Sequence, residues 1–205
     1  MQTLLLTGFE PFDGDLLNPS GMIVRNLHGS PLAEGIRIEG MVLPVSGPEA
    51  WVKLSRSVRR MQPQWVIAMG LSGREEISVE SAAWNEEDYR IPDNAGRQPR
   101  QLPILKKGPF QLVSGVSAAS LIPTGDGKLP VRGSEDPGRF VCNHLYYRLL
   151  HLSRRVSHCA HQRCLFLHLP AIPEMKTGTT GDQRRVFPLM EIQESVVRIL
   201  RRVAG

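Results

Sequence analysis

Three short and almost wholly apolar segments constrain the fold of this 205-residue chain more than any other feature. They cover residues 3–7 (TLLLT), 64–69 (QWVIAM) and 163–169 (RCLFLHL), and a glycine or a proline follows each one. A strand that is apolar along its whole length is typical of a parallel sheet covered on both faces. The three segments therefore predict buried parallel strands, and residues 36–45 predict a further strand with a more mixed pattern.

Helices are predicted between and after these strands. We expect one helix to begin at Asn18 and a second at Ser46, where Ser46 and Glu49 match a capping box. Two more are expected after residue 143 and near Pro188. The second helix has one apolar face, made of Trp51, Leu54, Val58 and Met61. Alternation of strands and helices indicates an α/β fold with a mainly parallel twisted sheet, in one domain over residues 1–205.

Residues 71–140 break this regularity, because they are rich in proline and glycine. Short strands are expected only around 77–83 and 129–132. A long irregular stretch inside a compact domain is unusual and often functional.

Charge and hydropathy narrow the classes of partner. The chain has 25 Lys and Arg against 20 Asp and Glu, a net charge of +5, but its basic doublets are scattered and aromatic residues make up only 6%. Nucleic-acid binding proteins gather basic residues with stacking aromatics, so a solvated surface explains the charge better. The opening residues do not match a signal peptide, and no segment is long enough to cross a bilayer. We expect a cytoplasmic protein with neither nucleic acid nor membrane as a partner.

The chain has three cysteines, Cys142, Cys159 and Cys164. A count that is small and odd argues against a disulfide scaffold. The run from His158 to Cys164 (HCAHQRC) packs four metal-binding side chains into seven residues. Structural zinc usually takes ligand pairs from two separate segments, so the interpretation favoured here is a helix-to-strand turn without metal.

Cys142, His168 and Glu80 are candidates for catalysis. Cys142 falls at the start of a predicted helix, where the helix dipole favours a thiolate. His168 ends an apolar strand and could take the thiol proton, and Glu80 could hold the imidazole in place. Each has an ordinary structural explanation by itself, and spacing along the chain cannot show that the three meet.

Four motifs, in order along the chain, resemble those of the pyroglutamyl peptidase I family of cysteine peptidases. They are Thr7–Phe12 (TGFEPF) with Asn18-Pro19, Arg90–Gly96 (RIPDNAG), Phe140–His144 (FVCNH) and Phe166–Pro170 (FLHLP). Together they span residues 3 to about 175.

This resemblance implies a three-layer α/β/α sandwich and removal of an N-terminal pyroglutamyl residue from small peptides through a thioester. Cys142 would be the nucleophile, His168 the general base and acid, and Glu80 the orienting carboxylate. Phe9 and Phe12 would line an apolar pocket for the lactam ring, and Arg90 would help to stabilise the oxyanion. No metal or cofactor is implied, and family members often form homo-oligomers.

The chain departs from the family pattern in four places. Ser81 stands where a basic residue is usual, the segment 70–74 is one residue short, and Pro137 replaces the usual alanine. A stretch rich in Gly and Pro, residues 122–138, replaces a helix. These departures keep open a diverged paralogue with altered N-terminal specificity, or one that binds without cleaving.

Overall fold

A seven-stranded sheet forms the centre of the computed structural model, which describes residues 1–122, 129–155, 163–175 and 185–205. Its strand order is β2-β3-β1-β4-β9-β5-β8, and β6 and β7 form a separate two-stranded sheet. The strands are β1 (Gln2–Phe9), β2 (Pro31–Ala33), β3 (Ile36–Leu43), β4 (Trp65–Leu71), β5 (Ile77–Glu80), β6 (Ala82–Trp84), β7 (Gln111–Val113), β8 (Val131–Ser134) and β9 (Arg163–Leu169). The helices are α1 (Pro19–Leu27), α2 (Gly47–Met61), α3 (Ala118–Leu121), α4 (Val141–Arg155) and α5 (Leu189–Ala204).

The three apolar segments form three adjacent central strands, β1, β4 and β9, as predicted. Their middle residues are fully or almost fully buried, including Leu5, Ile67 and Leu165. Strands β3, β1, β4 and β9 run parallel to one another, and β2 is antiparallel at one edge. Strand β5 pairs antiparallel with β9 and parallel with β8. The sheet is therefore mainly parallel, and it reverses direction beside β9.

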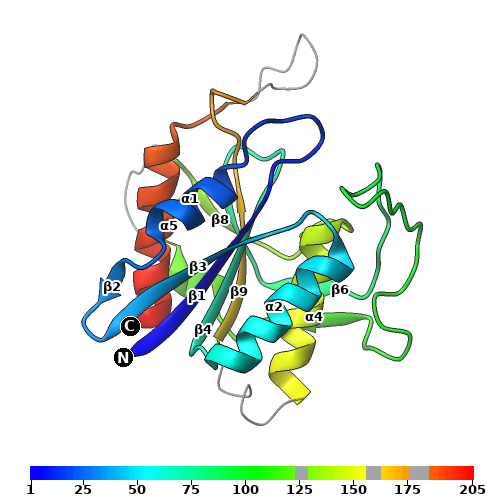
Figure 1. The fold of residues 1–205 in the computed structure, drawn as a ribbon, viewed down its shortest axis with the longest axis horizontal. Helices are drawn as coiled ribbons and strands as arrows, with labels where there is room; N and C mark the ends of the chain where they lie inside the picture. Colours follow the sequence, from blue (N-terminus) through cyan, green and yellow to red (C-terminus); the bar gives the residue numbers. More distant parts are fainter. Residues whose placement is uncertain (123–128, 156–162, 176–184) are drawn as a thin grey trace.

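Helices cover both faces of the twisted sheet (Figure 1). Helices α1 and α5 lie on one face, and α2 and α4 lie on the other. Each face has its own hydrophobic cluster, with Ile23 and Ile199 in one and Leu54 and Leu145 in the other. The expected three-layer α/β/α sandwich is confirmed. In the described part of the chain, no helix combines the length and the apolar character that a membrane span needs.

Local predictions had mixed outcomes. Asn18 caps α1, because its side chain accepts a hydrogen bond from the backbone N–H of Ser20 at 3.1 Å. Ser46 is the N-cap of α2 but makes no side-chain cap bond, so the predicted capping box is wrong in that detail. Strands β2 and β7 were not predicted, because three residues are too few to show a periodic pattern.

Candidate active site

Cys142 is the second residue of α4, and its side chain lies over the carboxyl end of β4. A Cβ atom built on Gly70 would fall only 2.7 Å from its Sγ atom, so a glycine is required for the thiol to lie here. Gly70 is the register partner of His168 on the neighbouring strand β9. Strand pairing therefore brings the nucleophile candidate and the imidazole to one place, although 26 positions separate them in the chain.

Glu80 and His168 form a buried pair. Glu80 lies opposite Phe166, and because alternate residues of a strand share a face, Phe166 and His168 point to the same side of β9. The His168 Nδ1 atom lies 2.8 Å from Oε1 of Glu80, and the two side chains are 6% and 0% exposed. An ionised carboxylate can only accept hydrogen bonds, so the imidazole tautomer that pairs with an ionised Glu80 has its proton on Nδ1 and leaves Nε2 as the basic nitrogen.

Arg74 completes the surroundings of Glu80, and the sequence analysis did not predict it. Its Nη1 atom donates to Oε1 of Glu80 at 2.8 Å and to Oγ of Ser134 at 3.0 Å. Arg74 is the only cationic residue between residues 71 and 89. That isolated charge, in the turn before a strand with a buried acid, is the signal that could have found it.

The thiol of Cys142 is not a resting thiolate. Burial, and then the negative charge of Glu80, raise its pKa to about 12, although its own backbone N–H acts in the opposite direction. The expected net lowering of this pKa is therefore wrong, because burial and Glu80 outweigh the effect of the helix N-terminus. At neutral pH the sulfur is protonated, and a base must take its proton before or during attack.

A cavity of about 140 Å³ opens beside Cys142. Its lining includes Phe9 and Phe12, the two residues assigned to it from the sequence. The other lining residues, which were given no pocket role, are Asp15, Leu17, Asn18, Val45, Leu71, Phe140 and Val141. Phe140 packs against Phe12 with ring centroids 5.0 Å apart, so aromatic rings form part of the wall. Mostly apolar walls with few polar groups suit a small uncharged ring.

Arg90, which the resemblance places at the oxyanion, has an exposed side chain that does not line the cavity. Its side chain is 81% exposed, and its partner is Asp13 at 4.0 Å. Such an exposed pair contributes little energy. The role of Arg90 at the oxyanion stays a prediction.

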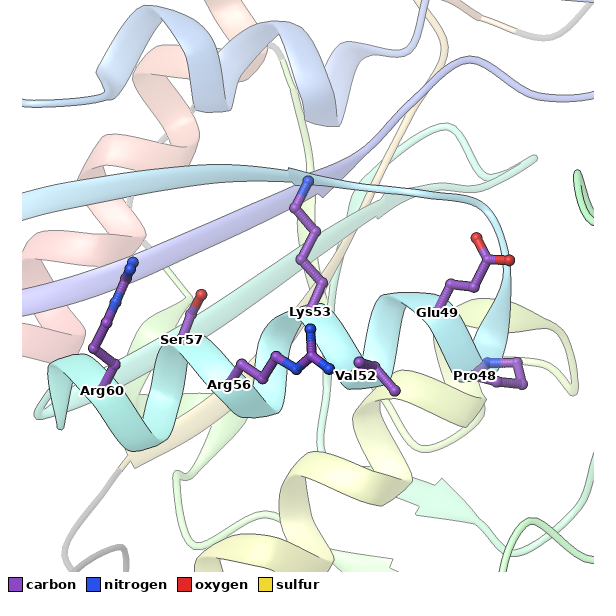
Figure 2. Close-up of a pocket in the computed structure, with 7 residues that line it drawn as sticks. All are labelled: Pro48, Glu49, Val52, Lys53, Arg56, Ser57 and Arg60. Carbon is purple, nitrogen blue, oxygen red and sulfur yellow. The ribbon is translucent and has the colours of Figure 1, made fainter.

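A larger hollow of about 470 Å³ lies on the outer face of α2 and has a different character (Figure 2). Its lining is Pro48, Glu49, Val52, Lys53, Arg56, Ser57 and Arg60. Lys53 extends toward β3, where its ammonium donates to the carbonyl of Val42 at 2.7 Å. The lining contains neither a cysteine nor a histidine, so this hollow lacks the groups that the chemistry at Cys142 needs.

The segment from His158 to Cys164, with its four metal-binding side chains, lies mostly outside the described residues, because only Arg163 and Cys164 of it are described. Cys164 is buried in β9. Among the side chains that the structure describes, no group of three or more His, Cys, Asp and Glu could hold a metal ion.

Comparison with known proteins decides the family. A family model described as pyroglutamyl peptidase matches residues 2–204. The chain belongs to the pyroglutamyl peptidase family. The pyrrolidone-carboxylate peptidase of Chromobacterium violaceum is 39% identical over 183 residues, which cover 88% of this chain and 83% of that protein. The enzyme of the same name from Klebsiella pneumoniae is also 39% identical, over 89% of this chain and 84% of its own length.

Solved structures support the same assignment. Pyroglutamyl peptidase I from Bacillus amyloliquefaciens superposes with a TM-score of 0.89 at 31% identity, over 100% of this chain and 98% of that one. Pyrrolidone carboxyl peptidase from Thermococcus litoralis also has a TM-score of 0.89, at 27% identity over 98% of this chain and 93% of that one. The protein is thus an enzyme of a family whose activity is the removal of N-terminal pyroglutamate.

Proposed function

We propose that Cys142, His168 and Glu80 remove the N-terminal pyroglutamyl residue from peptides, with the lactam ring bound in the cavity beside Cys142. The observation that carries this proposal is the pairing of His168 Nδ1 with Glu80 at 2.8 Å, next to a thiol held over Gly70. The pair leaves one basic imidazole nitrogen on the strand adjacent to the nucleophile.

The first half of the reaction forms a thioester. Nε2 of His168 takes the Sγ proton while sulfur attacks the pyroglutamyl carbonyl carbon. Glu80 stabilises the imidazolium through the Nδ1 hydrogen bond. Backbone N–H groups in the first turn of α4 have no acceptor within the helix. They can donate hydrogen bonds to the carbonyl oxygen and stabilise the negative charge that develops on it.

The second half restores the enzyme. The imidazolium gives its proton to the leaving amine as the C–N bond breaks, which releases the shortened peptide. Water then attacks the thioester with His168 as base, and pyroglutamate leaves as the C–S bond breaks. The sulfur regains its proton, so no proton or electron is left over.

The substrate follows from the cavity. A pyroglutamyl residue has no charged amine, and the lining contains Phe9, Phe12 and Phe140 in contact with a small volume. Small peptides with this N-terminus are the partners that we propose. The chain has three cysteines, an odd number that argues against a disulfide scaffold and suits a reducing compartment, and we propose a cytoplasmic location on that ground.

The test is hydrolysis of a fluorogenic pyroglutamyl amide by purified protein. We expect cleavage by the parent, none by Cys142→Ala, and near-parent activity in Cys164→Ala, a matched change at a thiol buried in β9. A panel of other aminoacyl amides separates the alternatives. Faster cleavage of another residue would indicate a diverged paralogue, and binding of a pyroglutamyl peptide by the folded parent without cleavage would contradict the proposed reaction.

A further inference from the structure

Glu80 has an unequal distribution of partners. Oε1 accepts from both His168 and Arg74 at 2.8 Å, whereas Oε2 is buried without a hydrogen-bond partner among the described residues. A fully buried carboxylate is costly unless a cation neutralises it. Arg74 places a guanidinium 2.8 Å from this carboxylate.

Arg74 also contacts the segment that leads into the nucleophile helix. Nη1 donates to Oγ of Ser134, and Nη2 donates to the carbonyl of Asp136 at 2.6 Å. Ser81 stands where the family pattern has a basic residue, and its backbone N–H and hydroxyl both donate to the carbonyl of Ser134. Ser81 carries no charge, and the guanidinium that contacts Glu80 is that of Arg74, from the preceding turn.

We propose that Arg74 is a positioning residue that keeps Glu80 ionised, and thereby sets the pH range in which His168 can act as the base. The proposal rests on the proposed function of the Cys142, His168 and Glu80 site. At rest the group carries one positive charge on Arg74 and one negative charge on Glu80. After proton transfer it gains one positive charge on His168 and one negative charge at the reacting atoms, so it stays neutral throughout.

Without the guanidinium, two effects act in the same direction. The buried Glu80 keeps its proton up to a higher pH, and a protonated Glu80 no longer stabilises the imidazolium. Where Glu80 is still ionised, His168 no longer faces a second cation on the same oxygen, so it also holds a proton to higher pH. Both effects remove the active form at acidic pH.

The other titratable groups around Glu80 do not account for a loss of the active form at acidic pH. Cys142 and Tyr146 approach it from α4, where the Tyr146 hydroxyl donates to the backbone carbonyl of Glu80 at 2.9 Å. Burial raises the pKa values of Cys142 and Tyr146, so both stay protonated over the acidic range. On the β8 side, the carboxylate of Asp136 is held by Arg139 at 2.6 Å.

The test compares pH–rate profiles of kcat/KM and kcat for the parent, Arg74→Met, Arg74→Lys and Arg139→Met. We expect the acidic limb of Arg74→Met to move up by about 1–3 pH units, the size of the effect of a neighbouring opposite charge on a carboxyl. Arg74→Lys keeps the positive charge, so the acidic limb of its pH–rate profile should stay near that of the parent, although kcat falls. Arg139→Met removes another anchor of the same segment without touching Glu80, and its limb should not move.

Chemical rescue adds a second readout. Because the Arg74 side chain is 35% exposed, a small ion can reach the vacated site of Arg74→Ala. Millimolar guanidinium chloride should restore part of the activity at acidic pH, whereas urea, of similar shape but uncharged, should not. An unmoved acidic limb in folded Arg74→Met, or equal shifts in Arg74→Met and Arg139→Met, would overturn the proposal. If the parent itself does not cleave pyroglutamyl amides, it is the proposed function that fails.

Discussion

The described part of the chain contains two buried glutamate–histidine pairs with nearly the same internal geometry. His168 Nδ1 lies 2.8 Å from Glu80 Oε1, and His144 Nδ1 lies 2.8 Å from Glu87 Oε1. In both pairs each side chain is at most 7% exposed. Distance and burial alone therefore do not separate the pair assigned to catalysis from the other.

The surroundings separate them. His168 is the register partner of Gly70, over which the thiol of Cys142 lies. The second ring nitrogen of His144 is instead buried with no hydrogen-bond partner among the described residues. The Glu87 Oε1 atom that pairs with His144 also accepts a hydrogen bond from the Tyr89 hydroxyl at 2.7 Å. A glutamate–histidine pair can serve catalysis only when the free imidazole nitrogen faces a reacting group.

The second pair lies next to the aromatic wall of the cavity beside Cys142. Tyr89 packs on Phe140 with ring centroids 4.5 Å apart, and Phe140 lines the cavity. His144 lies two positions after Cys142 in the first turn of α4. We therefore interpret the Glu87–His144 pair as a structural connection between the 85–97 loop and the nucleophile helix.

The largest expected effect comes from changing each histidine to glutamine. His168→Gln should lower kcat/KM by about 10²–10⁴-fold, the usual contribution of a general base. His144→Gln should keep activity within about tenfold but lower the free energy of unfolding by about 1–3 kcal/mol, because a buried charged hydrogen bond is weakened. Steady-state hydrolysis and urea unfolding measure the two quantities. An equal loss of activity in folded His144→Gln would give the second pair a part in the reaction.

A methyl group placed against the thiol of Cys142, or against the Glu87–His144 pair, provides the next test. In Gly70→Ala the new Cβ would displace the sulfur from its position, and a displacement of about 1 Å can cost about 10²-fold in rate. In Gly47→Ala the new Cβ would lie 2.9 Å from the Tyr89 hydroxyl and 3.0 Å from Cγ of His144. We expect Gly70→Ala to lose activity with little change in melting temperature, and Gly47→Ala to lower the melting temperature more than the activity.

Gly133→Ala is the control for both, since its Cβ would make only an ordinary contact at 3.5 Å with Ala118. If Gly70→Ala retained parent kinetics, the thiol would not occupy the position over Gly70 during turnover.

The smallest expected effect is a pH dependence of stability that belongs to Glu87. Burial alone would raise its pKa, but the hydrogen bond and charge of His144, with Tyr89 and Arg97, outweigh burial, and the pKa lies below its ordinary 4.5. The ionised form is therefore favoured by folding, and its contribution is fully present above about pH 4.5 and lost as the pH falls through the folded-state pKa. Glu87→Gln should be less stable than the parent near pH 6, and the difference should shrink below pH 4.5.

Urea unfolding between pH 3 and pH 7 measures this difference, with Glu34→Gln at an exposed position as the control. A constant difference at every pH would mean that the charge of Glu87 contributes nothing to stability.

Much of the fold was predictable because its signals are local. The strands β1, β4 and β9 are continuous apolar runs, and Asn18 caps α1 through atoms two residues away. The short strands β2 and β7 were missed because three residues are too few to show a periodic pattern, and pairing with β3 and β6 defines them instead. The same division applies to the site, where motifs identified Cys142 and His168. The isolated charge of Arg74 is a local signal, but its contact with Glu80 is seen only in the tertiary structure.

The sequence by itself determined the buried strands, the order of the helices and the four motifs that resemble one family, because apolar runs, caps and motif residues are properties of neighbouring positions. Only the tertiary structure decided which glutamate meets which histidine. The chain offers Glu80 and Glu87 within eight residues, and the antiparallel register of β5 on β9 brings the first to His168. It also decided the direction in which the pKa of the Cys142 thiol moves, because burial and the nearby Glu80 outweigh the helix N-terminus that the sequence could indicate.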